Sequence, residues 1–71
     1  MKEKEFLERL ATKLSDAPYL ELRKLEIEIH ANKIILRGSV RSFYLKQMAQ
    51  CSVKSECNGY EIQNLIEVIP N

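Results

Sequence analysis

Two runs of alternating apolar and polar residues meet at a short polar turn between Leu25 and Val40. Apolar side chains occupy every second position before the turn (Leu25, Ile27, Ile29, Ala31) and again after it (Ile34, Leu36, Val40). This period of two predicts a pair of β-strands. A two-residue turn at either Asn32-Lys33 or Ala31-Asn32 puts both apolar sets on one face, and the opposite face then carries Glu26, Glu28, His30, Ile35 and Arg37. We therefore expect a β-hairpin with one face against the core.

Helical spacing appears on both sides of this hairpin. The segment from Lys2 to Ser15 places Phe6, Leu7, Leu10, Ala11 and Leu14 on one side, which is typical of an amphipathic helix. Pro18 ends that helix, and Tyr19, Leu20 and Leu22 should pack beneath its end. Ser42 is a suitable N-cap for a second helix that runs to about Cys57 and stops at Asn58-Gly59. Its narrow inward stripe is expected to be Leu45, Met48, Ala49, Ser52 and Val53.

Strand-like alternation returns between Glu61 and Ile69. Ile62, Asn64, Ile66 and Val68 fall on one side, and Gln63, Leu65, Glu67 and Ile69 fall on the other. The predicted order is helix, strand, strand, helix, strand. This order indicates a single α+β domain over residues 1–71, in which a three-stranded mixed sheet has both helices packed on one face.

Composition limits the compartment and the partners. A chain of 71 residues with 11 basic and 10 acidic side chains has a formal charge of +1, which gives no general attraction to nucleic acid or anionic membranes. Cys51 and Cys57 lie six apart on one expected helix and cannot bridge, so they should be free thiols of a reducing compartment. No segment approaches the roughly 20 apolar residues that span a bilayer, and no apolar run follows the N-terminus. We expect a cytoplasmic protein.

Candidate chemistry is sparse. His30 is the sole histidine and lies on the outward face of a strand, without partners for a catalytic dyad. Cys51 and Cys57 on divergent helix faces cannot join it around one metal ion. Gly38 should mark a bulge or a close approach of the second helix, and Asn64 should be hydrogen-bonded to a neighbouring loop or strand. The sequence thus favours a non-enzymatic protein without cofactor, metal or small-molecule substrate.

Three stretches of the chain resemble the BON domain, a small bacterial module with the same order of helices and strands. They read LEIEIHANKIILRGSV, LKQMAQCSV and NGYEIQNLIEV. The family's second strand has an apolar-x-Leu-x-Gly-x-Val pattern, matched by Ile34, Leu36, Gly38 and Val40. Ala49 and Val53 match its small-residue helix, and its closing strand corresponds to Ile62, Asn64, Ile66 and Val68. The resemblance implies contact with phospholipid or partner proteins at the cell envelope. The chain departs from the family in having Asn32 at the turn glycine, and we expect neither a signal peptide nor a tandem copy.

Nucleic-acid binding is not expected. Type II KH domains share part of this element order, but they grip the backbone with a Gly-x-x-Gly loop, and the two glycines here, Gly38 and Gly59, are 21 residues apart. The nearest basic and aromatic cluster is Arg41, Phe43, Tyr44 and Lys46. We expect at most weak contact of these four residues with anionic lipid, decreasing with salt.

The open face of the sheet is the expected protein-binding surface. Ile35, Leu65 and Ile69 fall on it without visible cover, and Arg37 should pair there with Glu26 or Glu28. An apolar patch rimmed by charge is typical of an association surface. The sequence therefore favours a module that binds a protein partner, or a second copy of itself, through this open face or through an edge strand.

Overall fold

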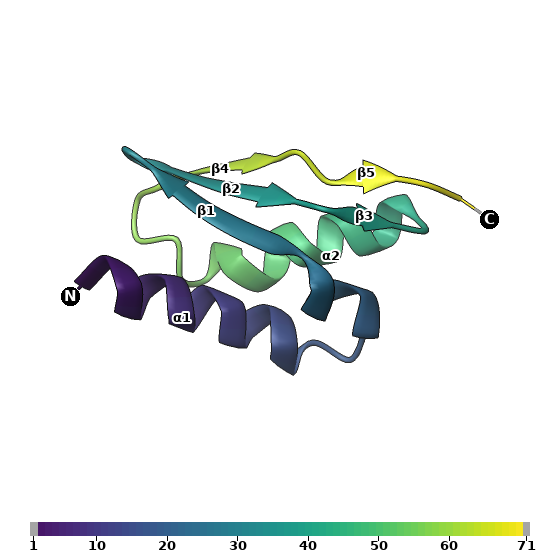
Figure 1. The fold of residues 1–71 in the computed structure, drawn as a ribbon, viewed down its shortest axis with the longest axis horizontal. Coiled ribbons are helices and arrows are strands. Elements are labelled where there is room, and N and C mark those ends of the chain that lie inside the picture. The colour runs from purple at the N-terminus through teal and green to yellow at the C-terminus, as the bar shows by residue number, and fades with distance from the viewer. Residues whose placement is uncertain (1, 71) are drawn as a thin grey trace.

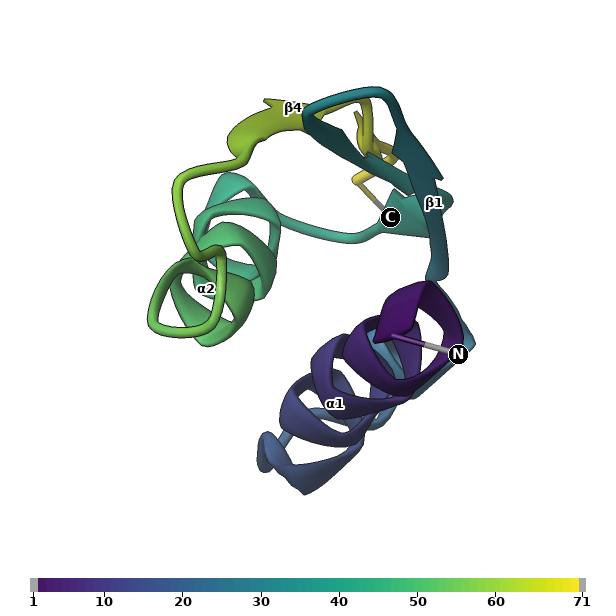
Figure 2. The same ribbon diagram turned by 90° about the vertical axis from the view of Figure 1, so that its left-hand side faces the viewer.

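The structure is a computed structural model that describes residues 2–70. Along the chain it contains α1 (Lys2–Asp16), a 3-10 helix η1 (Leu20–Lys24), β1 (Glu26–His30), β2 (Lys33–Arg37), β3 (Ser39–Val40), α2 (Phe43–Lys54), β4 (Glu61–Asn64) and β5 (Glu67–Val68). The strands form one layer and both helices lie on the same side of it (Figures 1 and 2). The expected α+β architecture is confirmed.

β2 is the central strand of the main sheet. It pairs antiparallel with β1, where Ile27 faces Leu36 and Ile29 faces Ile34, and parallel with β4, where Ile34 faces Ile62. His30 faces Lys33, so the turn is Ala31-Asn32, one of the two expected choices. The positive φ of the turn falls on Ala31 (φ 54) and not on Asn32, which stands at the turn glycine of the BON pattern.

The second strand pair continues the first. β3 and β5 are parallel, and the register does not change across the interruption: Leu36 faces Asn64, and three residues further along each segment Ser39 faces Glu67. Backbone hydrogen bonds from Leu65 to Leu36 (2.9 Å) and from Glu67 to Gly38 (2.9 Å) bridge the gap. The expected continuous alternation from Glu61 to Ile69 is therefore correct, although the strand bends in the middle.

The central strand also bends, at Gly38 between β2 and β3. Its φ of 136° is a backbone conformation that residues with a side chain rarely adopt. A Cβ at this position would also lie only 2.6 Å from Cδ2 of Leu25. The expected close approach exists, but the neighbour is the residue preceding β1 and the second helix is not involved. The missing side chain allows β2 and β3 to continue beside the start of β1.

The core fills the space between the sheet and the helices. Its buried members from α1 are Phe6, Leu10 and Leu14, from η1 Leu22, from the strands Ile34, Leu36 and Val40, from α2 Leu45, Ala49 and Val53, and from the last segment Ile66. Ala49 is the smallest of these and is fully buried, which agrees with the close packing expected for α2. The predicted strand parity is thus confirmed.

The end of α2 differs from the prediction. α2 ends at Lys54 and not near Cys57, because the chain tightens into 3-10-type hydrogen bonds from Glu56 to Val53 and from Cys57 to Lys54. Asn58 (φ 48) and Gly59 (φ 87) then form a turn closed by a 2.8 Å bond from Tyr60 to Cys57, and their positive φ angles are those of a type I′ turn. The predicted helix stop at Asn58-Gly59 is therefore wrong: these two residues form a separate turn that leads to β4.

Asn64 connects the last strand to α2. Its amide nitrogen donates to the carbonyl of Lys46 at 3.0 Å and to Oε1 of Gln50 at 3.3 Å, and its Oδ1 accepts from the backbone N–H of Ile66 at 3.2 Å. The predicted hydrogen-bonded role is confirmed, but the partner is a helix and not a neighbouring loop or strand. One side chain thus fixes α2 under the sheet and shapes the passage from β4 to β5.

Candidate binding surfaces

The open face of the sheet is less apolar than its sequence indicates. Ile35 points to this face but is only 8% exposed, since its neighbours Glu28, Gln63 and Arg37 carry long side chains that cover it. The expectation that Ile35 lies uncovered is therefore wrong. Leu65 (41% exposed) and Ile69 (53%) do reach solvent, on either side of Glu67. They leave two separate apolar spots and no continuous patch.

The predicted ion pair on this face is present. Arg37 stands opposite Glu26 in the hairpin register, but its Nε bonds diagonally to Oε1 of Glu28 at 2.6 Å. Both side chains are about half exposed, so the pair contributes at most about 1 kcal/mol to stability. Its main structural effect is to hold two long side chains beside Ile35.

The other predicted cluster lies where α2 begins. Ser42 caps the helix, accepting the backbone N–H of Leu45 at 3.2 Å, and this cap places Arg41 just before the first turn and Phe43 and Tyr44 within it. Phe43 is 70% exposed and Tyr44 is 55% exposed. Lys46 lies with its Nζ 6.0 Å from the centre of the Phe43 ring. The structure therefore brings all four predicted residues together.

η1 adds a further apolar side chain to this cluster. The Tyr19 and Tyr44 hydroxyls are 3.0 Å apart with their rings edge to face, and Nε of Arg41 is 3.2 Å from Oε1 of Glu21. Leu20 lies in the sequence between Tyr19 and Glu21, which make these two contacts, and is 68% exposed. We call this surface the aromatic end, made up of Leu20, Arg41, Phe43, Tyr44 and Lys46.

Leu20 was not recognised as a surface residue from the sequence. We expected it to pack under α1 together with Leu22, but in a 3-10 helix two residues that are two apart point in different directions. Leu22 takes the buried position and leaves Leu20 in solvent. The two-residue spacing of Leu20 and Leu22 could have indicated this, because a 3-10 helix does not allow both leucines to face one core.

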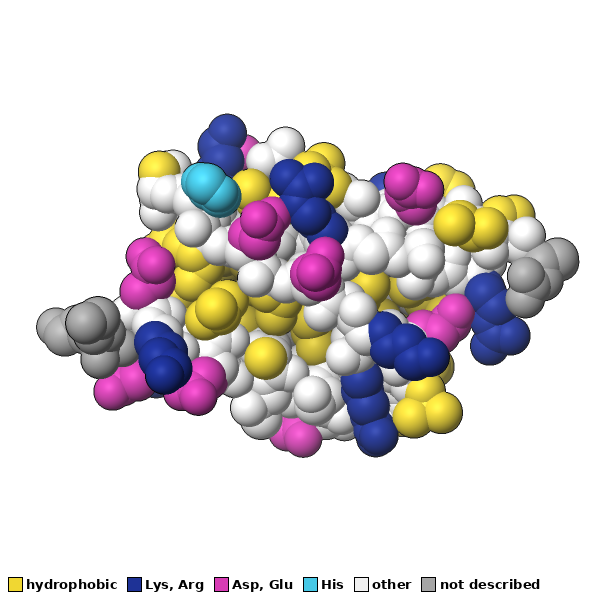
Figure 3. All heavy atoms as spheres, viewed as in Figure 1, with side chains coloured by type: hydrophobic (Ala, Val, Ile, Leu, Met, Phe, Trp, Pro, Cys, Tyr) yellow, Lys and Arg dark blue, Asp and Glu magenta, His cyan; other side chains and the backbone are white. Residues whose placement is uncertain are grey.

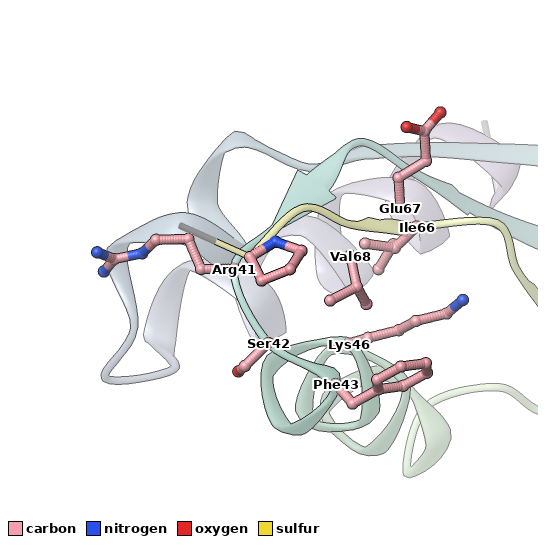
Figure 4. Close-up of a pocket in the computed structure, with 8 residues that line it drawn as sticks. Arg41, Ser42, Phe43, Lys46, Ile66, Glu67 and Val68 are labelled. Atoms are coloured by element: carbon pink, nitrogen blue, oxygen red, sulfur yellow. The ribbon is translucent and has the colours of Figure 1, made fainter.

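A shallow cleft of about 770 Å³ separates the start of α2 from β5. In Figure 4, Ile66 and Val68 project from the strand towards Lys46 and Phe43 on the helix, while Arg41 points away from the space between them. The walls are therefore mostly apolar, and Lys46 is the cation that borders the opening. The cleft extends the aromatic end towards the C-terminal strand.

Charge is unevenly distributed over the molecule. On the face seen in Figure 3, Lys and Arg side chains gather towards the end where the C-terminal strand leaves the fold, with hydrophobic side chains beside them. Acidic side chains are prominent at the opposite end, around the start of α1, which carries Glu3 and Glu5 in its first turn. The aromatic end thus lies in the more basic part of a nearly neutral protein.

Titratable groups give little sign of catalytic chemistry. The hydrogen bond between the Tyr19 and Tyr44 hydroxyls raises the pKa of Tyr19, the one group in the described residues with a resolved shift. Cys51 is exposed on α2 and Cys57 lies in the following turn; both are free. Within residues 2–70, no group of three His, Cys, Asp or Glu side chains is close enough to hold a metal ion, and no helix is long and apolar enough to cross a membrane.

Comparison with known proteins gives no assignment. The chain matches no protein-family model, no curated protein and no solved structure. Its function must therefore be inferred from its own surfaces.

Proposed function

We propose that this chain is a non-enzymatic module that binds another protein through its aromatic end. The observation that carries the proposal is the exposure of Leu20, Phe43 and Tyr44, each more than half exposed, around one helix start. Burying a single side chain of this size is worth about 1.5–3 kcal/mol. Three such side chains beside Arg41 supply the aromatic and arginine anchors that dominate protein interfaces.

The contacts within this end support a preorganised surface. The Ser42 cap fixes the first turn of α2, and the Tyr19–Tyr44 hydroxyl contact and the Arg41–Glu21 pair connect this end of α2 to η1 before any partner arrives. Side chains that are already held lose less conformational freedom on binding. A partner that fits would present an apolar side chain to Phe43 and the cleft, and a carboxylate to Lys46 or Arg41. The free thiols of Cys51 and Cys57 fit a reducing compartment such as the cytoplasm.

A second candidate function is peripheral contact with an anionic membrane. It is favoured by the same combination of exposed Phe43, Tyr44 and Leu20 with Arg41 and Lys46, and by the resemblance to the BON domain. The net charge of +1 weighs against it, because a membrane-binding surface of this size usually needs a larger basic cluster. We therefore place it below binding to a protein.

The test is photo-cross-linking from the native cell, with a photoreactive residue at exposed Gln47 and the variants Phe43→Ser and Leu20→Ser. Phe43→Ser and Leu20→Ser each remove one exposed side chain and should leave the fold unchanged. We expect each of these two variants to reduce the yield of one specific protein adduct at least tenfold. Leu65→Ser, which removes a partly exposed leucine from the open face, is the matched control and should preserve the adduct.

Two other outcomes would contradict this proposal. If Leu65→Ser removes the adduct and Phe43→Ser does not, the protein binds through the open face of the sheet; if the adduct is a second copy of the chain, that face is used for self-association. If no protein adduct forms, while phosphatidylglycerol vesicles co-sediment the protein at physiological salt and Arg41→Glu/Lys46→Glu abolishes this, the second candidate function is correct.

A further inference from the structure

The outer edge of β1 is open. Within residues 2–70, β1 pairs with β2 alone, and no strand lies along its other side. His30 and Lys33 flank the two-residue turn and form a hydrogen-bonded pair, so Glu28 and Glu26 also bond to β2. The backbone N–H and C=O groups of Ile27 and Ile29 then point away from the sheet. An edge of this kind is a template for another strand.

An apolar groove accompanies this edge. Two adjoining hollows of about 480 Å³ and 230 Å³ lie between α1 and β1 and share Leu7 and Ile27 as lining residues. Ile29 lines the first, and Leu25 and Ala11 line the second. Figure 3 shows this groove as a band of hydrophobic side chains between the strands and α1. Leu7, Leu25, Ile27 and Ile29 are each only half-buried, although the last three pack against the core.

We propose that this edge groove, which is separate from the aromatic end, binds an extended segment of a partner protein as an additional strand beside β1. The backbone of the segment would complete the hydrogen bonds of Ile27 and Ile29, and every second side chain would enter the groove. A helix or a lipid chain could fill the apolar space but would leave these backbone groups without partners. The open edge therefore specifies an extended polypeptide.

The charges beside the edge specify the remaining side chains of that segment. The outward residues of β1 are Glu26, Glu28 and His30, and Glu28 is also paired with Arg37 of β2. Glu3 and Lys4 stand together at the rim of the groove, so the negative charge beside the edge comes from the outward carboxylates of β1. Side chains on the outward face of an added strand would lie opposite these carboxylates. The occupant is thus a segment that alternates apolar residues with lysine or arginine. A second copy of β1 fits poorly, because the register that aligns two full β1 strands places Glu28 against its own copy.

The test uses NMR titration of the full chain with a blocked eight-residue peptide that alternates lysine and valine. Binding should shift the amide signals of Ile27 and Ile29 and slow their hydrogen exchange. N-methylation of the peptide nitrogens that face β1 should abolish these changes, while methylation of the other nitrogens should not. Replacing the lysines by glutamates should weaken binding about tenfold, since favourable cross-strand pairs become repulsive.

Variants of the protein provide a second comparison. Leu7→Gln removes one wall of the groove and should weaken binding of the lysine–valine peptide at least fivefold. Thr12→Gln, on an exposed part of the same helix, should leave binding of this peptide unchanged. If both methylated peptides bind equally well, or if the shifts occur around Phe43, strand addition at β1 is wrong. Equal binding of the lysine and glutamate peptides at β1 would reject the basic partner. Binding through the aromatic end is tested separately, by cross-linking of the Phe43→Ser and Leu20→Ser variants.

Discussion

Replacing Leu36 by alanine should lower the free energy of unfolding by about 2–5 kcal/mol. Leu36 is fully buried on the central strand, between Ile27 of β1 and Asn64 of β4, so the neighbours on both sides limit how far the cavity can close. A domain of 71 residues has a total stability of about 4–11 kcal/mol. The variant should therefore unfold at much lower urea concentration, or be largely unfolded without urea.

Leu65 provides the matched control. It lies between β4 and β5, and its backbone N–H donates to the carbonyl of Leu36 at 2.9 Å, but its side chain points to the open face and is 41% exposed. Leu65→Ala should cost less than about 1 kcal/mol, because little apolar surface leaves a buried environment. Similar urea midpoints for the two variants would mean that the strand faces are assigned incorrectly.

Replacing Gly38 by alanine should destabilise the fold by about 2–4 kcal/mol. Its φ of 136° lies in a region reserved almost entirely for glycine, and the new Cβ would meet Leu25 Cδ2 at 2.6 Å. Gly59→Ala is the comparison: φ is 87° there, but no atom lies within 4 Å of an added Cβ, and we expect a cost of about 1–2 kcal/mol.

A double variant separates the two causes at Gly38. Leu25→Ala removes the side chain that the new Cβ meets, so Leu25→Ala/Gly38→Ala should be less destabilised than the sum of the single changes. Thermal or urea unfolding of the four proteins measures this coupling. Simple additivity would show that the backbone conformation alone requires glycine, and equal costs at Gly38 and Gly59 would contradict the bend described for β2 and β3.

Most of the fold could be predicted because its sequence signals are local and periodic. Alternation located the hairpin and the last strand, and helical spacing located α1 and α2. The pairing of β4 with β2 could not be predicted, since a parallel crossover leaves no local signal in either strand. The identity of the residue facing Gly38 was likewise missed, because contact with Leu25 depends on how the hairpin twists and closes.

The candidate surfaces could be predicted only in part. Arg41, Phe43, Tyr44 and Lys46 are close in sequence, so a capped helix start brings them together directly. Ile35 was wrongly expected to be exposed because alternation gives the face of a residue and not the length of the side chains beside it. The edge groove was not identified, because its lining comes from two separate elements, α1 and β1, and emerges only when they pack.

Within residues 2–70, β2 is paired on both sides while the outer edge of β1 is free. Native-state amide hydrogen exchange followed by NMR tests it most directly. The account predicts slow exchange at Ile34, Ile35 and Leu36, slow exchange at Glu28, and fast exchange at Ile27 and Ile29 on the same strand. Protection of Ile27 and Ile29 equal to that of Ile34 and Leu36 would contradict it, because the edge on which the strand-addition site depends would then be closed.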